Sequence, residues 1–325
     1  MSDEFIHAPV MAGEILQIFA GVPSGWILDA TLGGAGHAAL LLEHHGHLRV
    51  LGLDRDGDAL AVAGERLAVF GDRAVTAHLR FDELEHAMEA LSIDSLSGAL
   101  FDLGVSSPQL DRAERGFSYR LDAPLDMRMD RRDEWNAGDL VNGTDERQLA
   151  QVLRRNGDER FATRIARAIV AARPIETTSR LAEVVVTAIP AAARRTGGHP
   201  AKRTFQALRI EVNRELDVLP IALERAIDRT AEGGRVAVLS YHSGEDRIVK
   251  DVMRHAETGG CTCPPELPCV CDAVQTVRVV RRIPKTPTAD EMAANPRARS
   301  ARLRVVERTR PTRRGGEVVA TTRET

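Results

Sequence analysis

The stretch Trp26-Ile-Leu-Asp-Ala-Thr-Leu-Gly-Gly-Ala-Gly-His37 decides which fold the sequence predicts. Its apolar beginning is typical of a buried strand that ends at Asp29, and its end is compatible with the start of a helix. The glycines between the two let the backbone turn tightly and approach a ligand beside the exposed N–H groups of that helix start. A tight turn without a ligand is the alternative interpretation of this stretch alone.

Strand-like and helix-like segments alternate through the first hundred residues, and strand-like segments return near the end. The predicted strands are residues 26–30, 49–54, 75–79, 98–104, 235–240, 275–282 and 301–308. Almost continuously apolar strands separated by helices are typical of a parallel sheet covered on both faces. The predicted fold class is therefore α/β with a Rossmann-like sheet.

An inserted α-helical domain interrupts this sheet, because helical patterns dominate from about residue 112. The helices expected there lie around residues 145–156, 159–172, 179–192 and 202–228, and Thr178-Ser179 is the expected N-cap of the third. The predicted domains are a sheet domain in two parts, a helical substrate-recognition domain and a disordered tail, at residues 1–111 and 219–310, 112–218, and 311–325.

Length and composition exclude several classes of protein. The 325 residues, 43% of them apolar, suffice for a full hydrophobic core. No run approaches the roughly 18 uninterrupted apolar residues of a membrane span, and the N-terminus has no secretory pattern. We therefore predict a cytoplasmic protein without a membrane partner.

The net charge of −3 is unevenly distributed along the chain. Residues 1–145 contain 11 basic and 25 acidic residues, whereas residues 146–215 contain 14 and 7, and residues 276–314 contain 12 and 3. Phosphate binding requires positive surface. The two basic segments therefore predict an RNA partner that the net charge conceals.

The glycine loop is compatible with two cofactors. A dinucleotide site would require G-x-G-x-x-G, but the chain has Gly33-Gly-Ala-Gly36, with Asp29 four residues before Gly33. Asp54 ends the second predicted strand, where a carboxylate can accept both hydroxyl groups of a ribose. A loop that must hold an ammonium and a carboxylate, rather than a pyrophosphate, favours S-adenosylmethionine.

The segment after the fourth strand, residues 101–109 (FDLGVSSPQ), is the predicted catalytic loop. Open parallel sheets bind ligands at the carboxyl ends of their strands. The lone pair of an exocyclic base amine is delocalised into its ring, and acceptors for its N–H groups favour the pyramidal geometry that attacks a methyl group. We predict catalytic roles for Asp102 and Ser106; the alternative for Asp102 is a turn cap.

Several long strings resemble the bacterial ribosomal RNA small subunit methyltransferase H family, also called MraW. They are HAPVM at 7–11, the loop at 29–37, FDLGVSSPQLD at 101–111, ERGFSYR at 114–120, PLDMRMD at 124–130, KRTFQALRIEVNREL at 202–216, SYHSGEDR at 240–247 and NPRARSARLRV at 295–305. The resemblance implies a class I S-adenosylmethionine-dependent methyltransferase. It further implies N4-methylation of one cytidine in the decoding (P-site) region of 16S rRNA, with the small subunit as partner and no DNA.

The same resemblance assigns the cofactor contacts by motif. They would be Ala35, Gly36, His37, Asp54 on the ribose, Phe81 against the adenine, and Asp102 and Gln109 closing the pocket. Two positions depart from the family pattern: Ala35 stands where a glycine is usual, and Gly244 stands where a leucine is usual.

Other residues are candidates for the substrate side. Tyr119 is predicted to stack on a base, while packing between the sheet and the insert is the preferred interpretation of Trp135. Lys202, Arg203 and Arg209 are predicted to contact RNA, and a solvated helix face is the open alternative. His242 follows a strand at the ligand-bearing edge and is a catalytic candidate, although a lone histidine is more often structural.

All four cysteines lie at Cys261, Cys263, Cys269 and Cys271. Zinc is one interpretation, but the C-x-C pairs are tighter than the usual ligand spacing, so we predict reduced thiols and no metal, with a disulfide least favoured. Two alternatives to an rRNA methyltransferase remain at this point. One is an RNA-binding assembly factor with a vestigial cofactor site, and the other is a methyltransferase for a protein or small molecule.

Overall fold

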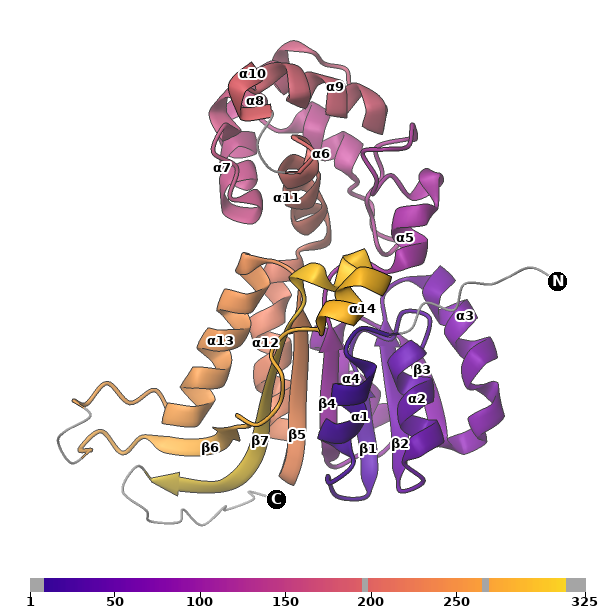
Figure 1. The fold of residues 1–325 in the computed structure, drawn as a ribbon, viewed down its shortest axis with the longest axis vertical. Coiled ribbons are helices and arrows are strands. Elements are labelled where there is room, and N and C mark those ends of the chain that lie inside the picture. The colour runs from indigo at the N-terminus through magenta and orange to yellow at the C-terminus, as the bar shows by residue number, and fades with distance from the viewer. Residues whose placement is uncertain (1–8, 195–197, 265–268, 314–325) are drawn as a thin grey trace. The chain divides into compact units, whose positions relative to one another are not determined.

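The computed structural model describes residues 9–194, 198–264 and 269–313. The chain divides into two compact units, Met1–Gly104 with Val218–Thr325, and Val105–Asp217. Figure 1 shows the first as a sheet with helices around it and the second as a group of helices. We call them the sheet unit and the helical unit.

The sheet of the sheet unit has seven strands among the described residues, in the order β3-β2-β1-β4-β5-β7-β6. The strands are β1 (Gly25–Asp29), β2 (Leu48–Asp54), β3 (Ala74–His78), β4 (Leu96–Asp102), β5 (Thr230–Ser240), β6 (Val274–Val279) and β7 (Arg302–Arg313). Strands β3, β2, β1, β4 and β5 are mutually parallel, whereas β7 runs antiparallel to both of its neighbours. The parallel arrangement predicted from the strands of the first hundred residues is confirmed for β1 to β4, and β7, which enters the sheet between β5 and β6, is the antiparallel strand.

Helices cover both faces of this sheet, as alternation along the strands requires. Ile27 belongs to the core formed with α1, α2 and α3, and its neighbour Leu28 belongs to the core formed with α4, α12 and α13. The helices of the unit are α1 (Ala12–Phe19), α2 (Gly36–His44), α3 (Gly57–Leu67), α4 (Leu84–Ala90), α12 (Glu215–Arg229), α13 (Ser243–Thr258) and α14 (Ala289–Ala294), with 3-10 segments η1 (Ala68–Arg73), η2 (Phe81–Glu83) and η4 (Pro296–Ser300).

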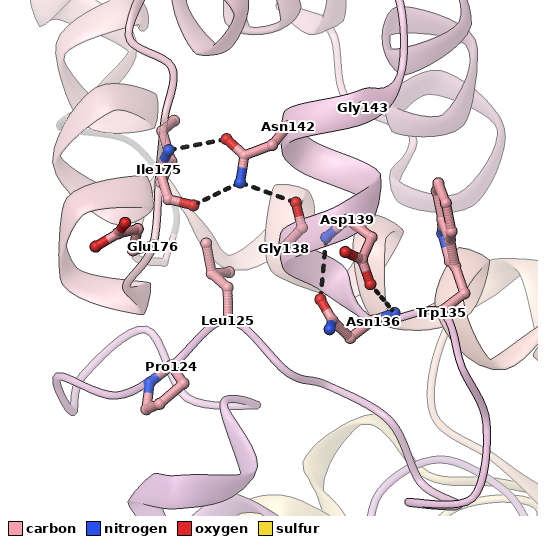
Figure 2. Close-up of a pocket in the computed structure, with 10 residues that line it drawn as sticks. All are labelled: Pro124, Leu125, Trp135, Asn136, Gly138, Asp139, Asn142, Gly143, Ile175 and Glu176. Carbon is pink, nitrogen blue, oxygen red and sulfur yellow. Dashed lines mark hydrogen bonds between the residues drawn. The ribbon is translucent and has the colours of Figure 1, made fainter.

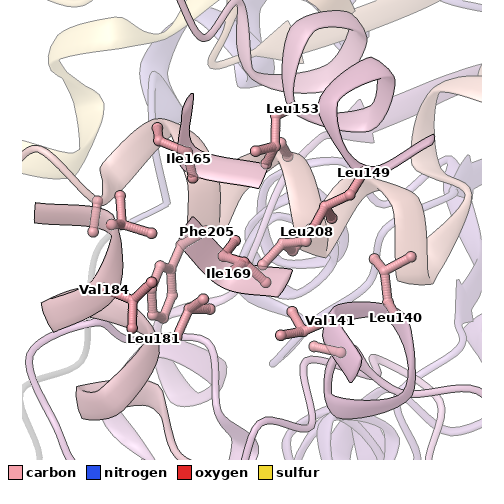
Figure 3. Close-up of a cluster of buried hydrophobic side chains, with 14 of the residues drawn as sticks. Leu140, Val141, Leu149, Leu153, Ile165, Ile169, Leu181, Val184, Phe205 and Leu208 are labelled. Atoms are coloured by element: carbon pink, nitrogen blue, oxygen red, sulfur yellow. The ribbon is translucent and has the colours of Figure 1, made fainter. Parts of the chain in front are cut away.

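The helical unit has its own hydrophobic core (Figure 3), which Leu149, Ile165, Leu181 and Leu208 help to form from four different helices. Its elements are α5 (Ser107–Asp111), η3 (Ala113–Arg115), α6 (Ala137–Gly143), α7 (Glu146–Gly157), α8 (Ala162–Ala171), α9 (Thr178–Ala188), α10 (Ala191–Arg194) and α11 (Lys202–Asn213). In the described part of the chain, no helix is long and apolar enough to cross a membrane.

The borders of the units differ from the predicted ones. The helical unit begins at Val105 rather than at residue 112, because Gly104 leaves the strand with a φ of 99° and Ser106 then caps α5. The predicted tail was expected to begin at residue 311, but β7 continues to Arg313. Residues 314–325 lie outside the described residues.

The helix predicted over 202–228 is broken at Arg214, which has a φ of 51° in the left-handed region. The side chain of Asn213 fixes this break, because its amide donates to the Met127 carbonyl and its oxygen accepts from the Met129 N–H, both at 2.8 Å. These partners are more than 80 residues away in the sequence, so no local signal announced the break. The α9 N-cap also moves, from the predicted Thr178-Ser179 to Thr177.

Candidate active site

The site lies where β1 and β4 are neighbours in the sheet. From β1 the chain proceeds outward to β2 and β3, and then returns to β4 and β5 on the other side. Such a switch in strand order opens a crevice at the carboxyl ends of the strands. Asp29 ends β1 and Asp102 ends β4, so two carboxylates flank this crevice.

The glycine loop turns from β1 into α2 through two residues in the left-handed region. Gly33 has a φ of 52° and Ala35 a φ of 58°. The family glycine at position 35 would adopt this conformation freely, whereas an alanine costs roughly 1 kcal/mol more. At Gly36 an added Cβ would lie 2.9 Å from Pro9 Cγ, so this position requires glycine for packing.

Asp54 at the end of β2 holds the loop in place. Its Oδ2 accepts from the Gly33 N–H at 2.7 Å, and its Oδ1 accepts from the Asp56 N–H at 2.8 Å. Burial raises the pKa of Asp54, although these hydrogen bonds favour its ionised form. Each carboxylate oxygen keeps a further lone pair, so the fixed carboxylate can also accept ribose hydroxyl groups.

Asp29 is a buried carboxylate beside the same loop. Burial raises its pKa to about 7, against the opposing effects of His37 and of a hydrogen bond from the Thr31 N–H. A positive ligand group placed here would stabilise the ionised form. The position of Asp29 therefore suits an ammonium group.

His37 is the clearest sign that a polar ligand belongs in this crevice. Its side chain is 7% exposed, and neither ring nitrogen has a hydrogen-bond partner among the described residues. Its Nε2 lies 3.6 Å from Asp102 Oδ2, beyond hydrogen-bond distance. Buried polar groups are normally paired, so the ring fits a ligand that supplies the missing partner.

Asp102 is held by two groups that the other strands supply. The Tyr241 hydroxyl donates to its Oδ1 at 2.6 Å, and its backbone N–H donates to Thr31 Oγ1 at 2.6 Å. Burial, followed by the negative charge of Asp102, raises the pKa of Tyr241, so the phenol remains protonated and a donor. The predicted turn-cap alternative for Asp102 is not what the structure shows.

Sequence reasoning missed Tyr241 as a site residue. It directly follows β5, whose Leu239 pairs with Asp102 across the sheet, so it emerges at the same edge. A position directly after a strand at the ligand-bearing edge indicates a site residue. That signal applies to Tyr241, but only the adjacent His242 was predicted from it. Phe81, predicted to lie against an adenine, packs edge-to-face on Phe101 with ring centroids 5.9 Å apart.

His242 has the structural role that the sequence left open as its alternative. It is the N-cap of α13, where its Nδ1 accepts from the Glu245 N–H at 3.4 Å. Its Nε2 lies 3.1 Å from Glu245 Oε1. The capping box pairs Nδ1, whereas Nε2 is buried without a hydrogen-bond partner among the described residues. A catalytic role for His242 stays a prediction.

Ser106 and Gln109 belong to the helical unit, where they bind one another. The Ser106 N–H donates to Gln109 Oε1 at 3.0 Å, and the Gln109 N–H donates to Ser106 Oγ at 3.4 Å. This reciprocal pair caps α5. The catalytic role of Ser106 and the cofactor contact of Gln109 therefore stay predictions.

Of the predicted RNA contacts, Arg209 is corrected by the structure. Its guanidinium forms two 2.8 Å bonds with the Glu215 carboxylate, and the two side chains are only 13% and 12% exposed. Arg209 therefore stabilises the turn between α11 and α12 instead of presenting a charge to phosphate. Lys202 and Arg203 are exposed at the start of α11, where Arg203 donates to the Asp158 carbonyl at 3.0 Å.

The two aromatic candidates differ in exposure, and base stacking by the half-buried Tyr119 stays a prediction. Tyr119 stacks on His199, with centroids 4.4 Å apart, and meets Phe205 edge-on, so one ring face is already covered.

Trp135, for which packing was preferred, is 50% exposed and lines a cavity of about 640 Å³ in the helical unit (Figure 2). Asn142, between the Gly138 carbonyl and Ile175, holds the wall of this cavity. Trp135 is thus the more accessible stacking surface.

A second cavity, of about 520 Å³, lies in the sheet unit beside Tyr241 and His242. Four exposed cations line it: Arg247, Lys250, Arg299 and Arg302. None of these four has an ion-pair partner in the described part of the chain. Of the two carboxylates in the lining, Asp246 is paired with Arg304 at 2.7 and 2.9 Å, and Asp251 is exposed. This cation pocket therefore fits a phosphate, and no single segment of the sequence announced it.

The strand order, the glycine loop and the polar strand ends define a class I S-adenosylmethionine-dependent methyltransferase. A family model described as the MraW methylase family matches residues 4–309. A protein named Ribosomal RNA small subunit methyltransferase H from Thermobifida fusca (strain YX) is 51% identical over 311 residues, 94% of each chain. The chain therefore belongs to the MraW methylase family.

The chain is also similar to a second relative and, more distantly, to a solved structure. A protein of the same name from Heliobacterium modesticaldum is 48% identical over 312 residues, which cover 94% of this chain and 99% of that protein. Among solved structures, an rRNA methylase from Streptococcus thermophilus matches 92% of this chain and 93% of its own, with 12% identity and a TM-score of 0.37.

Proposed function

We propose that this protein methylates the N4 amine of a cytidine in the decoding (P-site) region of 16S rRNA, with S-adenosylmethionine as methyl donor. The observation that carries the proposal is the Asp102 carboxylate at the switch point, with Tyr241 on one oxygen and His37 near the other. The relatives at about 50% identity are named as methyltransferases of small-subunit rRNA. The choice of a cytidine and of its N4 atom rests on the family resemblance.

Residues of the sheet unit would hold the cofactor. Asp54, which already holds the Gly33 N–H, would accept the ribose hydroxyls, Phe81 would pack on the adenine, and Asp29 would pair with the ammonium. The methionine carboxylate would supply the partner that His37 lacks. When bound, S-adenosylmethionine supplies an electrophilic methyl group.

Asp102 activates the acceptor. Its carboxylate accepts a hydrogen bond from an N–H of the base amine, which draws the nitrogen lone pair out of conjugation with the ring. When the nitrogen takes the methyl group, one proton must leave it, and the oxygen of Asp102 that faces His37 is the nearest base for that proton.

Tyr241 is a positioning residue for this carboxylate. Its hydroxyl donates to Oδ1 and leaves Oδ2 for the amine. The Asp102 N–H is fixed at the same time by Thr31. The carboxylate therefore keeps one orientation before substrate arrives, which is the form of preorganisation that stabilises a transition state.

The cation pocket would bind the RNA backbone beside the target base. Arg247, Lys250, Arg299 and Arg302 lie next to Tyr241, so a phosphate bound by them brings the adjoining nucleotide toward the strand ends. A base that reaches this crevice has left its stack. Trp135 offers an exposed indole for stacking an unpaired base in the helical unit.

The test is transfer of labelled methyl groups to 30S subunits, free 16S rRNA, single-stranded DNA and bulk protein, followed by mass spectrometry of the modified nucleoside. We expect label in rRNA alone, recovered as N4-methylated cytidine, at an initial rate that Asp102→Asn lowers about 10²–10³-fold. Label in protein or in a small molecule would overturn the substrate. Rescue of subunit assembly by Asp102→Asn, without any methyl transfer, would favour an assembly factor.

A further inference from the structure

The four cysteines of the chain meet at one point of the sheet unit. The Sγ atoms of Cys261, Cys263, Cys269 and Cys271 lie within 4.8 Å of one another. Cys261 and Cys263 follow α13 in the chain, and Cys269 and Cys271 precede β6. Three are half-buried and Cys271 is exposed.

The spacing of the sulfur atoms fits a tetrahedral ion. Zn–S bonds of about 2.3 Å place the sulfurs of a tetrahedral site about 3.8 Å apart. The Sγ of Cys269 lies 3.5 Å from that of Cys261 and 3.3 Å from that of Cys271, and the other separations reach at most 4.8 Å. These values bracket the tetrahedral spacing and are far from the roughly 2.05 Å of a disulfide.

The backbone prepares this site from both sides. Gly259 ends α13 with a φ of 63°, and an added Cβ would lie 2.4 Å from the Val274 nitrogen at the start of β6. Gln275 in β6 donates to the Glu257 carbonyl in α13 at 2.7 Å. The two ends of the connection are therefore fixed against each other, which lowers the entropy that four ligands must lose to bind one ion.

We propose that Cys261, Cys263, Cys269 and Cys271 bind one zinc ion as four thiolates. The tight C-x-C spacing, which argued against zinc from the sequence, does not prevent the sulfurs from converging. Four protein ligands leave no open position, so the site is structural and takes no part in methyl transfer. It fastens the connection that leads into β6, the strand at the edge of the sheet.

Soft thiolates select zinc over magnesium or calcium, which prefer oxygen ligands. Binding releases the thiol protons and replaces repulsion among four thiolates by their attraction to the dication. Reduced thiols without metal and a disulfide pair are the other states of the same cluster, and they are outcomes of the test.

The test begins with metal analysis of the full-length protein, purified without chelators. We expect about one equivalent of zinc per chain. Replacement by cobalt should give the strong thiolate-to-metal absorption and the visible bands of a tetrahedral site. Less than roughly a tenth of an equivalent, together with no such absorption on cobalt titration, would overturn the proposal. A mass two hydrogens lower under native purification would assign a disulfide and would overturn it as well.

Two variants separate the site from its surroundings. Cys271→Ser should lose most of the bound zinc and the four-thiolate cobalt spectrum, whereas Val270→Ser, at a residue 86% exposed between two of the ligands, should keep both. Full zinc content in Cys271→Ser would count against four-thiolate binding. Because no cysteine lies elsewhere in the chain, chelation should also raise the number of rapidly reacting thiols to four.

Discussion

Two buried groups at the strand ends of the sheet unit lack partners that two buried groups of the helical unit have. At the strand ends, His37 has both ring nitrogens unpaired and Asp29 has a pKa near neutrality. In the helical unit, Arg209 is bonded twice by Glu215, and Asn213 bonds both Met127 and Met129. The first arrangement costs stability and the second contributes to it.

Whether a buried polar group has a hydrogen-bond partner distinguishes ligand-binding residues from structural residues better than the residue type does. Arginine in a basic segment predicted an RNA contact, yet the fold uses Arg209 internally. His242 caps a helix through Nδ1, while its buried Nε2 has no hydrogen-bond partner among the described residues, so its catalytic role stays a prediction. The groups that the fold leaves incomplete are the ones expected to meet a ligand.

The largest effect should come from the carboxylate that faces the amine. Asp102→Asn removes the negative charge but keeps an oxygen for Tyr241, so single-turnover methyl transfer should fall about 10²–10³-fold with little change in unfolding free energy. The matched control is Asp126→Asn in the helical unit, where Arg128 binds both carboxylate oxygens at 2.7 and 3.0 Å.

That control should lose about 1–2 kcal/mol of unfolding free energy and keep its rate with a saturating cofactor. If Asp102→Asn lost stability and Asp126→Asn lost rate, the assignment of the two carboxylates would be reversed.

The next effect concerns the buried ion pair. Arg209→Met leaves Glu215 buried without its partner and should cost about 3 kcal/mol of stability, measured by urea unfolding. The double variant with Glu215→Leu should recover part of that loss, because no unpaired charge remains. A variant that unfolds like the wild type but binds rRNA with a weaker salt dependence would restore Arg209 as a phosphate contact.

The amount by which buried Asp29 lowers the free energy of unfolding should depend on pH. A carboxyl group with a pKa of about 7 in the folded chain and 3.8 as its ordinary value binds more protons when folded, so the ligand-free protein loses stability as pH rises between those values. Asp29→Asn should therefore be more stable than the wild type at pH 8, by on the order of 4 kcal/mol, with the difference shrinking toward pH 4.

The same substitution should weaken S-adenosylmethionine binding, since the ammonium loses its carboxylate. Thermal unfolding across pH and calorimetric titration measure the two effects. Equal stability of both proteins at pH 8 would show that Asp29 is not strained in the ligand-free state.

The smallest effect should come from the exposed cations. Lys250→Gln and Arg299→Gln in the cation pocket should each lower the slope of log affinity for rRNA against log salt by about 0.7–0.9, with cofactor affinity unchanged. Arg310→Gln is the matched control in the second basic segment, because Glu232 already pairs with Arg310 at 2.9 Å. A control that flattened the slope as much as the pocket variants would remove the distinction between free and paired cations.

Local patterns were sufficient for much of the fold. The first four strands, the glycine loop and the helical insert follow from apolar alternation and turn residues between near neighbours in the chain. The break at Arg214 was out of reach, since Arg214 carries no glycine or proline signal and its cause lies at Met127 and Met129. The antiparallel β7 was equally hidden, because strand direction depends on which neighbours a strand joins.

The sequence by itself determined the class of protein, the family and the position of three acidic strand ends, because each of these is written in short contiguous motifs. Only the tertiary structure decided that Tyr241 donates a hydrogen bond to Asp102, 139 positions away in the sequence. It also decided that Arg209 forms an ion pair with Glu215 and that the four thiols converge. The physical reason is that a motif records what the backbone does locally. Whether a side chain is satisfied, strained or free depends on partners that only chain folding brings within hydrogen-bond distance.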